Sequence, residues 1–120
     1  MTDAQWDIMD ALWTAGSASA SDLTTALKER RGWAYSTVKT QLDRMGKAGM
    51  VHAEKQGGVW TYSAVLSREC ARRSAWERFR DVVFGGSAAP ALAFAAQEED
   101  LSDAERQALL ELIDAGEEPT

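Results

Sequence analysis

The stretch WAYSTVKTQLDRMGKAGMV, residues 33–51, decides the fold. Within it, Val38, Leu42 and Met45 recur with the i, i+4, i+7 spacing of a buried helix face. Gly49 follows them as a helix stop, and the residues after this glycine have the composition of a strand. The stretch therefore predicts an amphipathic helix that is followed directly by a strand.

Two further helices are expected before this stretch. Thr2 and Gln5 have the spacing of a capping box, and apolar residues follow them at helical spacing. Ser19 and Asp22 offer a second cap, and the helix that begins there is expected to end near Gly32. Residues 1–50 thus predict three short helices.

A β-hairpin is expected after the third helix. The runs MVHAEK and VWTYSAV have strand composition, and Gly57 and Gly58 between them supply the positive φ that a tight hairpin turn requires. Trp60 and Tyr62 share one face of the second strand and are expected to pack against the helices. Three helices followed by a hairpin is the element order of a winged helix-turn-helix.

The second half predicts helices alone. Gly85 and Gly86 break an arginine-rich helix, and Ser102 with Glu105 caps a later one. The predicted fold is thus mainly α with a small β-hairpin wing. A winged-helix DNA-binding domain is expected at residues 1–66, and a three-helix dimerisation region at residues 67–120.

The second region is expected to need a partner. About 50 residues in three helices cannot enclose a good core, so their apolar faces are expected to pack on a second copy of the chain. The alternative is that they fold back on the N-terminal helices. The residues expected in a dimer interface are Trp76, Phe79, Val83, Phe84, Leu92, Phe94, Leu109, Leu112 and Ile113.

The net charge of −6 is unevenly placed along the 120 residues. Residues 1–66 are neutral overall, residues 67–120 carry the whole −6, and the segment from Lys28 to Lys55 has a local charge of +4. The acidic balance therefore says little about nucleic-acid binding by the first half. No apolar run approaches the roughly 18 residues that span a bilayer, and the acidic N-terminus is unlike a signal peptide. A cytoplasmic protein is expected.

Single cysteine and histidine residues limit the chemistry. Cys70 and His52 are alone of their kind, so one chain cannot build a disulfide, a zinc finger or a Cys–His catalytic pair from them. Cys70 is expected to be a small buried thiol and His52 a surface or strand residue. No metal and no cofactor are expected.

The outer face of the third helix is suited to DNA. Short hydroxyl side chains reach phosphates and base edges without bulk, and lysine or arginine reaches guanine or the backbone. Lys55, Gln56 and Gly57 would add a contact at the tip of the wing. The predicted DNA-binding residues are Ser36, Thr37, Lys39, Thr40, Asp43, Arg44, Lys47, Lys55, Gln56 and Gly57.

A winged helix that binds a protein partner instead of DNA is the second interpretation. Asp43 is the one residue on this face that favours it, because a carboxylate opposes phosphate unless it pairs with Lys39 or Arg44 or accepts from a cytosine amine. An enzyme is not expected. The carboxylates of the second half occupy solvated helix positions and caps, and the sequence has no glycine-rich phosphate loop, nucleophile motif or metal constellation.

The chain also resembles the penicillinase-repressor (BlaI/MecI) family of bacterial transcription regulators. The matching pieces run in order along nearly the whole sequence: AQWDIMDALW, WAYSTVKTQLDRMGKAGMV, WTYSAVLSRE, FGGSAAPALAF and EEDLSDAERQALLELI. The resemblance implies a homodimer with an N-terminal winged helix that represses operons by binding palindromic operators. A serine-proline pair often opens the family's recognition helix. Here Ala34 and Tyr35 stand in its place, so the usual cap is missing.

The resemblance also implies a mode of release. In β-lactam-responsive members, a signal from a membrane sensor protease leads to cleavage within the dimerisation region. The motif around that bond maps onto Leu92, Ala93 and Phe94, with Ala93 where staphylococcal members usually have asparagine. Copper-responsive relatives carry a cysteine-rich tail. The tail DAGEEPT has no cysteine, so copper sensing by that route is not expected.

Overall fold

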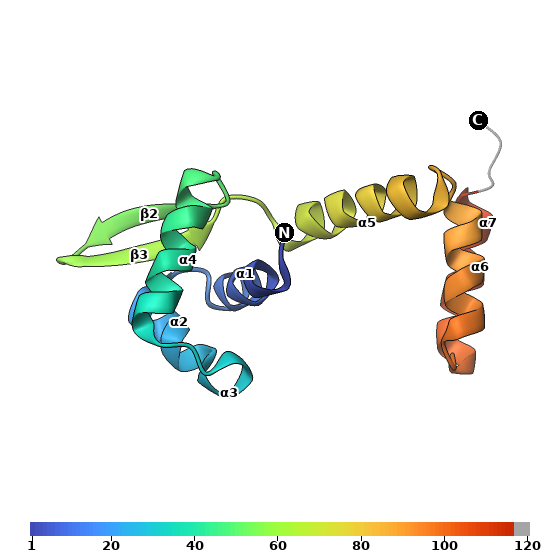
Figure 1. Ribbon diagram of the computed structural model, residues 1–120. Helices are drawn as coiled ribbons and strands as arrows, with labels where there is room; N and C mark the ends of the chain where they lie inside the picture. The colour runs from blue at the N-terminus through green and yellow to red at the C-terminus, as the bar shows by residue number, and fades with distance from the viewer. Residues whose placement is uncertain (117–120) are drawn as a thin grey trace. The chain divides into compact units, whose positions relative to one another are not determined.

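The computed structural model describes the backbone of residues 1–116 and the side chains of residues 1–111. It confirms the predicted fold class, because helices predominate and a small antiparallel sheet forms the wing of a winged helix (Figure 1). The elements are α1 (Asp3–Ala15), β1 (Ala18–Ser19), α2 (Ala20–Ala26), α3 (Lys28–Arg31), α4 (Tyr35–Lys47), β2 (Val51–Gln56), β3 (Val59–Ala64), α5 (Arg68–Phe84), α6 (Ala88–Glu98) and α7 (Asp103–Gly116).

The chain divides into two compact units, Met1–Arg73 and the residues from Ser74 onward. The division falls within α5, because the first turns of that helix pack with the winged helix. The boundary predicted at residue 66 stays a prediction. Of the helices in the described part of the chain, none is both long and apolar enough to span a bilayer.

The first unit encloses one hydrophobic core beneath the sheet. Val38, Leu42 and Met45 of α4 are fully buried, as the spacing in residues 33–51 predicts. The core is completed from the other helices and the sheet. Its members are Ile8, Met9, Leu12, Ala18, Ala20, Leu23, Leu27, Val38, Leu42, Met45, Val51 and Tyr62.

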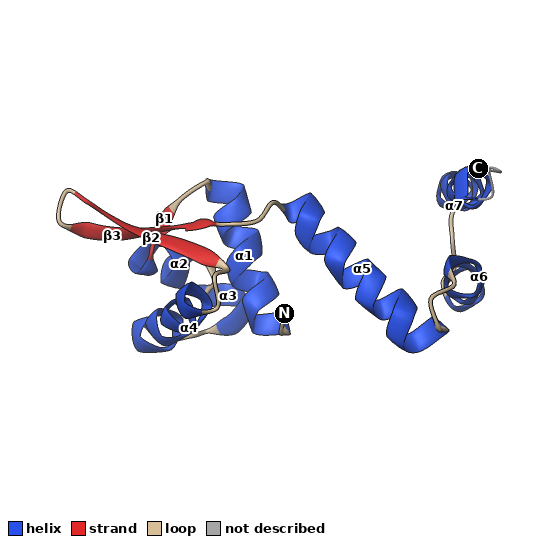
Figure 2. Ribbon diagram, turned by 90° about the horizontal axis from the view of Figure 1, so that it is seen from above, coloured by secondary structure: helices blue, strands red, loops and turns tan. Residues whose placement is uncertain are grey.

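The sheet has the strand order β1-β3-β2, with both pairs antiparallel (Figure 2). Gln56 pairs with Val59 across the turn, and Gly57 and Gly58 have φ of 57° and 81°. Positive φ at both central residues is the type I′ geometry that follows the twist of a hairpin. The strand β1 was not predicted, because two residues, of which Ser19 is also the cap of α2, are too few to show the alternation of a strand.

Both predicted capping boxes of the first unit form. Thr2 Oγ1 accepts from the Gln5 amide at 3.1 Å, and Ser19 Oγ accepts from the Asp22 amide at 3.1 Å. The prediction of one helix from Ser19 to Gly32 is wrong at Leu27, where α2 ends and the short α3 begins. Leu27 stays buried in the core while the chain turns, and no glycine or proline marks that turn in the sequence.

Two expected core positions are exposed. Tyr62 is buried as predicted, but Trp60 is half exposed, because it lies nearer the hairpin tip, beyond the cover of the helices. Cys70 is exposed as well, since its neighbour Ala71 takes the buried position in that turn of α5. His52 is exposed on β2, as expected.

The beginning of α5 is attached to α1 within the first unit. Arg68 Nη2 donates to Asp10 Oδ1 at 2.7 Å, and its guanidinium lies 5.4 Å from the centre of the Trp13 ring. Trp13 Nε1 donates to the Leu66 carbonyl at 2.9 Å. Ser67 caps α5 by accepting from the Cys70 amide at 3.1 Å.

The second unit has little core of its own. Among its described side chains, Ala91 alone is buried, although α6 and α7 lie side by side. Of the predicted interface residues, Trp76, Phe79, Val83 and Phe94 are exposed. Phe84, Leu92 and Leu109 are partly buried. The side chains of Leu112 and Ile113 lie outside the described residues.

Candidate nucleic-acid interface

The outer face of α4 carries most of the predicted DNA-binding residues. Ser36, Thr40, Asp43 and Lys47 follow one another at i, i+4, i+7 and i+11, and all four are exposed. This spacing places them on one ridge, opposite the three fully buried residues of the same helix. We call these four residues the α4 ridge.

The remaining predicted residues of α4 flank the ridge. Thr37 and Arg44 are exposed, and Lys39 is partly buried on the side that faces the sheet. Ala34 caps the helix without a side-chain hydrogen bond, as the missing serine-proline pair implies. Thr40 Oγ1 donates to the Ser36 carbonyl at 2.9 Å, which leaves the oxygen of the hydroxyl able to accept.

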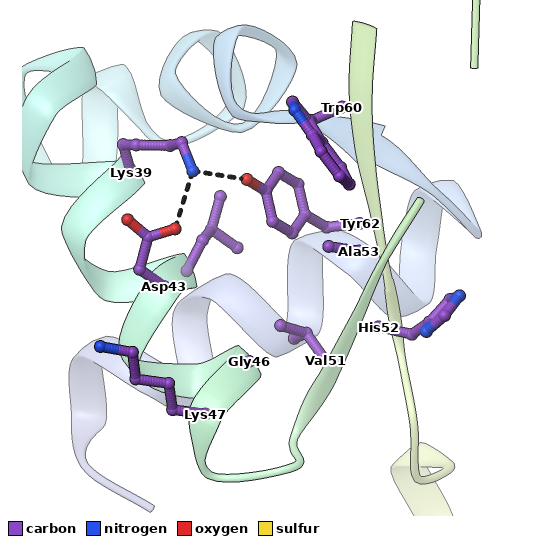
Figure 3. Close-up of a pocket in the computed structure, with 10 residues that line it drawn as sticks. Lys39, Asp43, Gly46, Lys47, Val51, His52, Ala53, Trp60 and Tyr62 are labelled. Carbon is purple, nitrogen blue, oxygen red and sulfur yellow. Dashed lines mark hydrogen bonds and ion pairs between the residues drawn. The ribbon is translucent and has the colours of Figure 1, made fainter. Parts of the chain in front are cut away.

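Lys39 joins the ridge to the wing. Its ammonium group donates to Asp43 Oδ1 at 2.7 Å and to the Tyr62 hydroxyl at 3.0 Å (Figure 3). The Asp43 bond raises the pKa of Lys39 most and the Tyr62 bond raises it next, so the lysine stays charged at neutral pH. Of the two cations that the sequence offers to Asp43, Lys39 and Arg44, the structure pairs it with Lys39.

A groove of about 490 Å³ lies between α4 and the strands of the wing. Lys39, Asp43 and Lys47 line it from the helix, and Trp60 and Tyr62 line it from β3 (Figure 3). Ammonium groups therefore stand along its helical wall and aromatic rings along the other.

The wing tip is exposed where the sequence predicts a contact. Lys55 and Gln56 end β2, and Gly57 opens the turn. A Cβ atom at Gly57 would meet no atom within 4 Å other than those of Gly57 and its two chain neighbours, so the space around this backbone is open. A backbone without side chains can approach a phosphate closely here.

Three exposed apolar residues on this face were missed by the sequence reasoning. Tyr35 is 52% exposed, Val59 54% and Trp60 50%. They line a second hollow, of about 250 Å³, together with Ser19 and Ser21 at the beginning of α2. The alternation of β3 predicts that Trp60 and Tyr62 lie on the same face of the sheet. How far the helices extend over that face cannot be read from the sequence.

The sequence matches the family model described as penicillinase repressor over residues 1–115. The chain belongs to the penicillinase repressor family. The resemblance noted in the sequence is thereby confirmed. The family is one of transcriptional repressors, so the chain is a winged-helix transcriptional repressor and not an enzyme.

Relatives match over almost the full length of this repressor. An uncharacterised 16.5 kDa protein of Latilactobacillus sakei is 28% identical over 115 residues, which cover 96% of this chain and 79% of the relative. The methicillin resistance regulatory protein MecI of Mammaliicoccus sciuri is 22% identical over 113 residues, or 94% of this chain and 92% of MecI.

A solved structure is similar to the winged-helix part of this repressor. It is the solution structure of the monomeric form of Bacillus licheniformis BlaI in complex with the blaP half-operator. The identity is 25% and the TM-score 0.52, and the match covers 57% of this chain and 84% of the BlaI chain.

Proposed function

We propose that this repressor binds a palindromic operator as a homodimer, with α4 in the major groove and the wing against the adjacent backbone. The α4 ridge carries this proposal, because it presents the hydroxyl groups of Ser36 and Thr40 and the ammonium group of Lys47 on an exposed helix beside the wing. The similar BlaI structure contains a half-operator, which supports the same mode of binding here.

Arg44 and Lys47 are the cations best placed to contact DNA. Neither makes an ion pair or side-chain hydrogen bond within residues 1–111. Lys39, in contrast, already donates to Asp43 and Tyr62. We therefore assign the phosphate contacts of α4 chiefly to Arg44 and Lys47, and those of the wing to Lys55.

Dimerisation through the second unit is supported by the apolar side chains that this unit leaves exposed. Trp76, Phe79 and Phe84 form a row of neighbouring aromatic rings along α5, and Phe94 of α6 extends the row with its ring 5.9 Å from that of Phe84. Covering such a row by a second copy removes apolar surface from water and gives two DNA-binding units with one two-fold axis.

For release, we propose an inducing signal such as β-lactam-triggered proteolysis between Ala93 and Phe94 by a membrane sensor protease. Both residues are exposed, which supports access to this bond. They lie within α6, so a protease that takes an extended substrate requires local unwinding of this helix first. Cleavage there would cut the row of aromatic rings and weaken the dimer.

A protein partner in place of DNA is the competing function. The exposed Tyr35, Val59 and Trp60 favour it, since aromatic and apolar side chains on a surface are common at protein interfaces. Against it stand the hydroxyl residues and Lys47 of the α4 ridge and the flanking Arg44.

Fluorescence anisotropy with the DNA upstream of the chain's own gene tests the proposal, with a scrambled duplex as the control. We expect selective binding that saturates at two chains per site and weakens steeply as salt is raised, because released counterions dominate the binding free energy. If the chain does not bind that duplex, selection from a random-sequence library shows whether it binds another DNA sequence. A library that yields no enriched site would refute DNA binding and favour the protein partner.

A further inference from the structure

The α4 ridge contains one residue that does not suit a phosphate-binding face. Asp43 stands in the middle of the ridge, between Thr40 and Lys47, and its side chain is 55% exposed. If the ridge enters the major groove, this carboxylate is carried in with it. A carboxylate against phosphate is repelled, so a favourable arrangement needs a hydrogen-bond donor on a base.

The carboxylate is fixed in place by the wing. Lys39 Nζ donates to Asp43 Oδ1 and also to the hydroxyl oxygen of Tyr62. Tyr62 is a buried residue of the core, so it limits the movement of the lysine. Oδ2 receives no hydrogen bond from any residue between 1 and 111 and lies on the side of the carboxylate away from the ammonium nitrogen of Lys39 in Figure 3. One oxygen is thus held and the other is available to a ligand.

We propose that Asp43 determines specificity by accepting a hydrogen bond from the N4 amino group of a cytosine, and that Lys39 is the residue that positions it. This inference rests on the proposed DNA-binding function. The Asp43 carboxylate would then recognise a base. Lys39 partly offsets its charge, and the hydrogen bonds from Lys39 to Asp43 and Tyr62 set its orientation.

The major groove offers two amino donors, and their surroundings distinguish them. Adenine presents its N6 amino group beside the acceptor N7, which repels a second carboxylate oxygen. Cytosine presents N4 without a neighbouring acceptor on the same base, and aspartate or glutamate is its usual protein partner. A carboxylate with one oxygen already bonded therefore fits cytosine better than adenine.

The test is a random-sequence selection with the full chain, followed by competition binding at the selected site. Wild type is expected to select cytosine at one position in each half-site. Asp43→Asn keeps the size of the side chain but can also donate, and asparagine pairs with adenine. This variant is expected to change the cytosine-to-adenine preference at that position by about tenfold, because asparagine can both accept from adenine N6 and donate to N7.

Variants of Lys39 test the positioning role separately. Lys39→Met is expected to reduce the cytosine preference without moving it to another base, because the carboxylate loses its fixed orientation, and Lys39→Arg is expected to restore it. A residue with a purely structural role would change affinity for all sequences alike. An unchanged cytosine preference in Lys39→Met would overturn the positioning role.

The control is Asp3→Asn, which removes the same charge from an exposed position in the first turn of α1. It is expected to leave every base preference unchanged, and circular dichroism checks that all variants are folded. If wild type selects a site and Asp43→Asn selects the same bases at every position, the inference is overturned and DNA binding stands. If wild type selects no site, the proposed function fails first.

Discussion

Phe79→Ala should weaken the dimer strongly while leaving each winged-helix unit folded. Phe79 lies on α5, is 47% exposed and stands in the row of aromatic rings between Trp76 and Phe84. Its exposed surface is the surface that a partner would cover. A two-fold axis brings the same residue from both copies into the interface, so one substitution acts twice.

The magnitude follows from the area. A phenylalanine side chain offers about 200 Å², so 47% exposure leaves roughly 90 Å² per copy and about 180 Å² per dimer. At about 25 cal/mol per Å², covering all of it contributes about 4.5 kcal/mol, and covering half contributes about 2 kcal/mol. With about 1.4 kcal/mol for each factor of ten, the dimer dissociation constant should rise by about 30- to 1,600-fold.

Sedimentation equilibrium of the full chain measures this constant directly. Val65→Ala is the matched control, because Val65 is an apolar residue of the first unit that is 60% exposed and lies outside the predicted interface. Circular dichroism reports whether α5 remains helical in both variants. If Phe79→Ala and Val65→Ala dissociate at the wild-type concentration, the row of aromatic rings is not the interface, and the reasoning from exposed apolar area fails.

Three further substitutions test the first unit. Arg44→Ala should weaken operator binding and lower the salt slope by about two, since one phosphate contact is lost from each copy of the dimer; an unchanged slope would remove Arg44 from the interface. Trp13→Phe deletes the indole donor to the Leu66 carbonyl and should lower the free energy of unfolding by about 1 kcal/mol in urea, and wild-type stability would show that this bond contributes nothing. Asp7→Asn removes a buried charge that pairs with Arg30 and Arg31 and should cost about 1–2 kcal/mol in the same assay; a more stable variant would contradict that estimate.

Patterns confined to one element were readable from the sequence. The buried face of α4, the two capping boxes and the glycine turn depend on residues a few positions apart, so local chemistry decides them. The pairing of Asp43 with Lys39 was also foreseeable as an i, i+4 ion pair.

Features that depend on where one element ends relative to another were not readable. Leu27 interrupts a helix because the core needs its side chain, and no breaker residue signals it. Trp60 is exposed because the helices stop short of the hairpin tip. The Tyr62 hydroxyl meets Lys39 across 23 residues of sequence, and that contact converts an ordinary surface ion pair into a carboxylate with a fixed orientation.

The acidic isoelectric point of about 4.7 does not argue against DNA binding once the charges are assigned to the two units. Residues 1–73 contain ten basic and eight acidic residues, for a net charge of +2, while residues 74–120 contain three basic and eleven acidic residues, for −8. Exposed charges farther apart than the Debye length, about 8–10 Å at physiological salt, are largely screened from one another. The charges that act most on a phosphate at α4 are those within this distance of it, and among these Lys39 offsets Asp43 and leaves Arg44 and Lys47 to act. Net charge describes the whole chain, but recognition depends on the few charged side chains that lie within one Debye length of the bound phosphate.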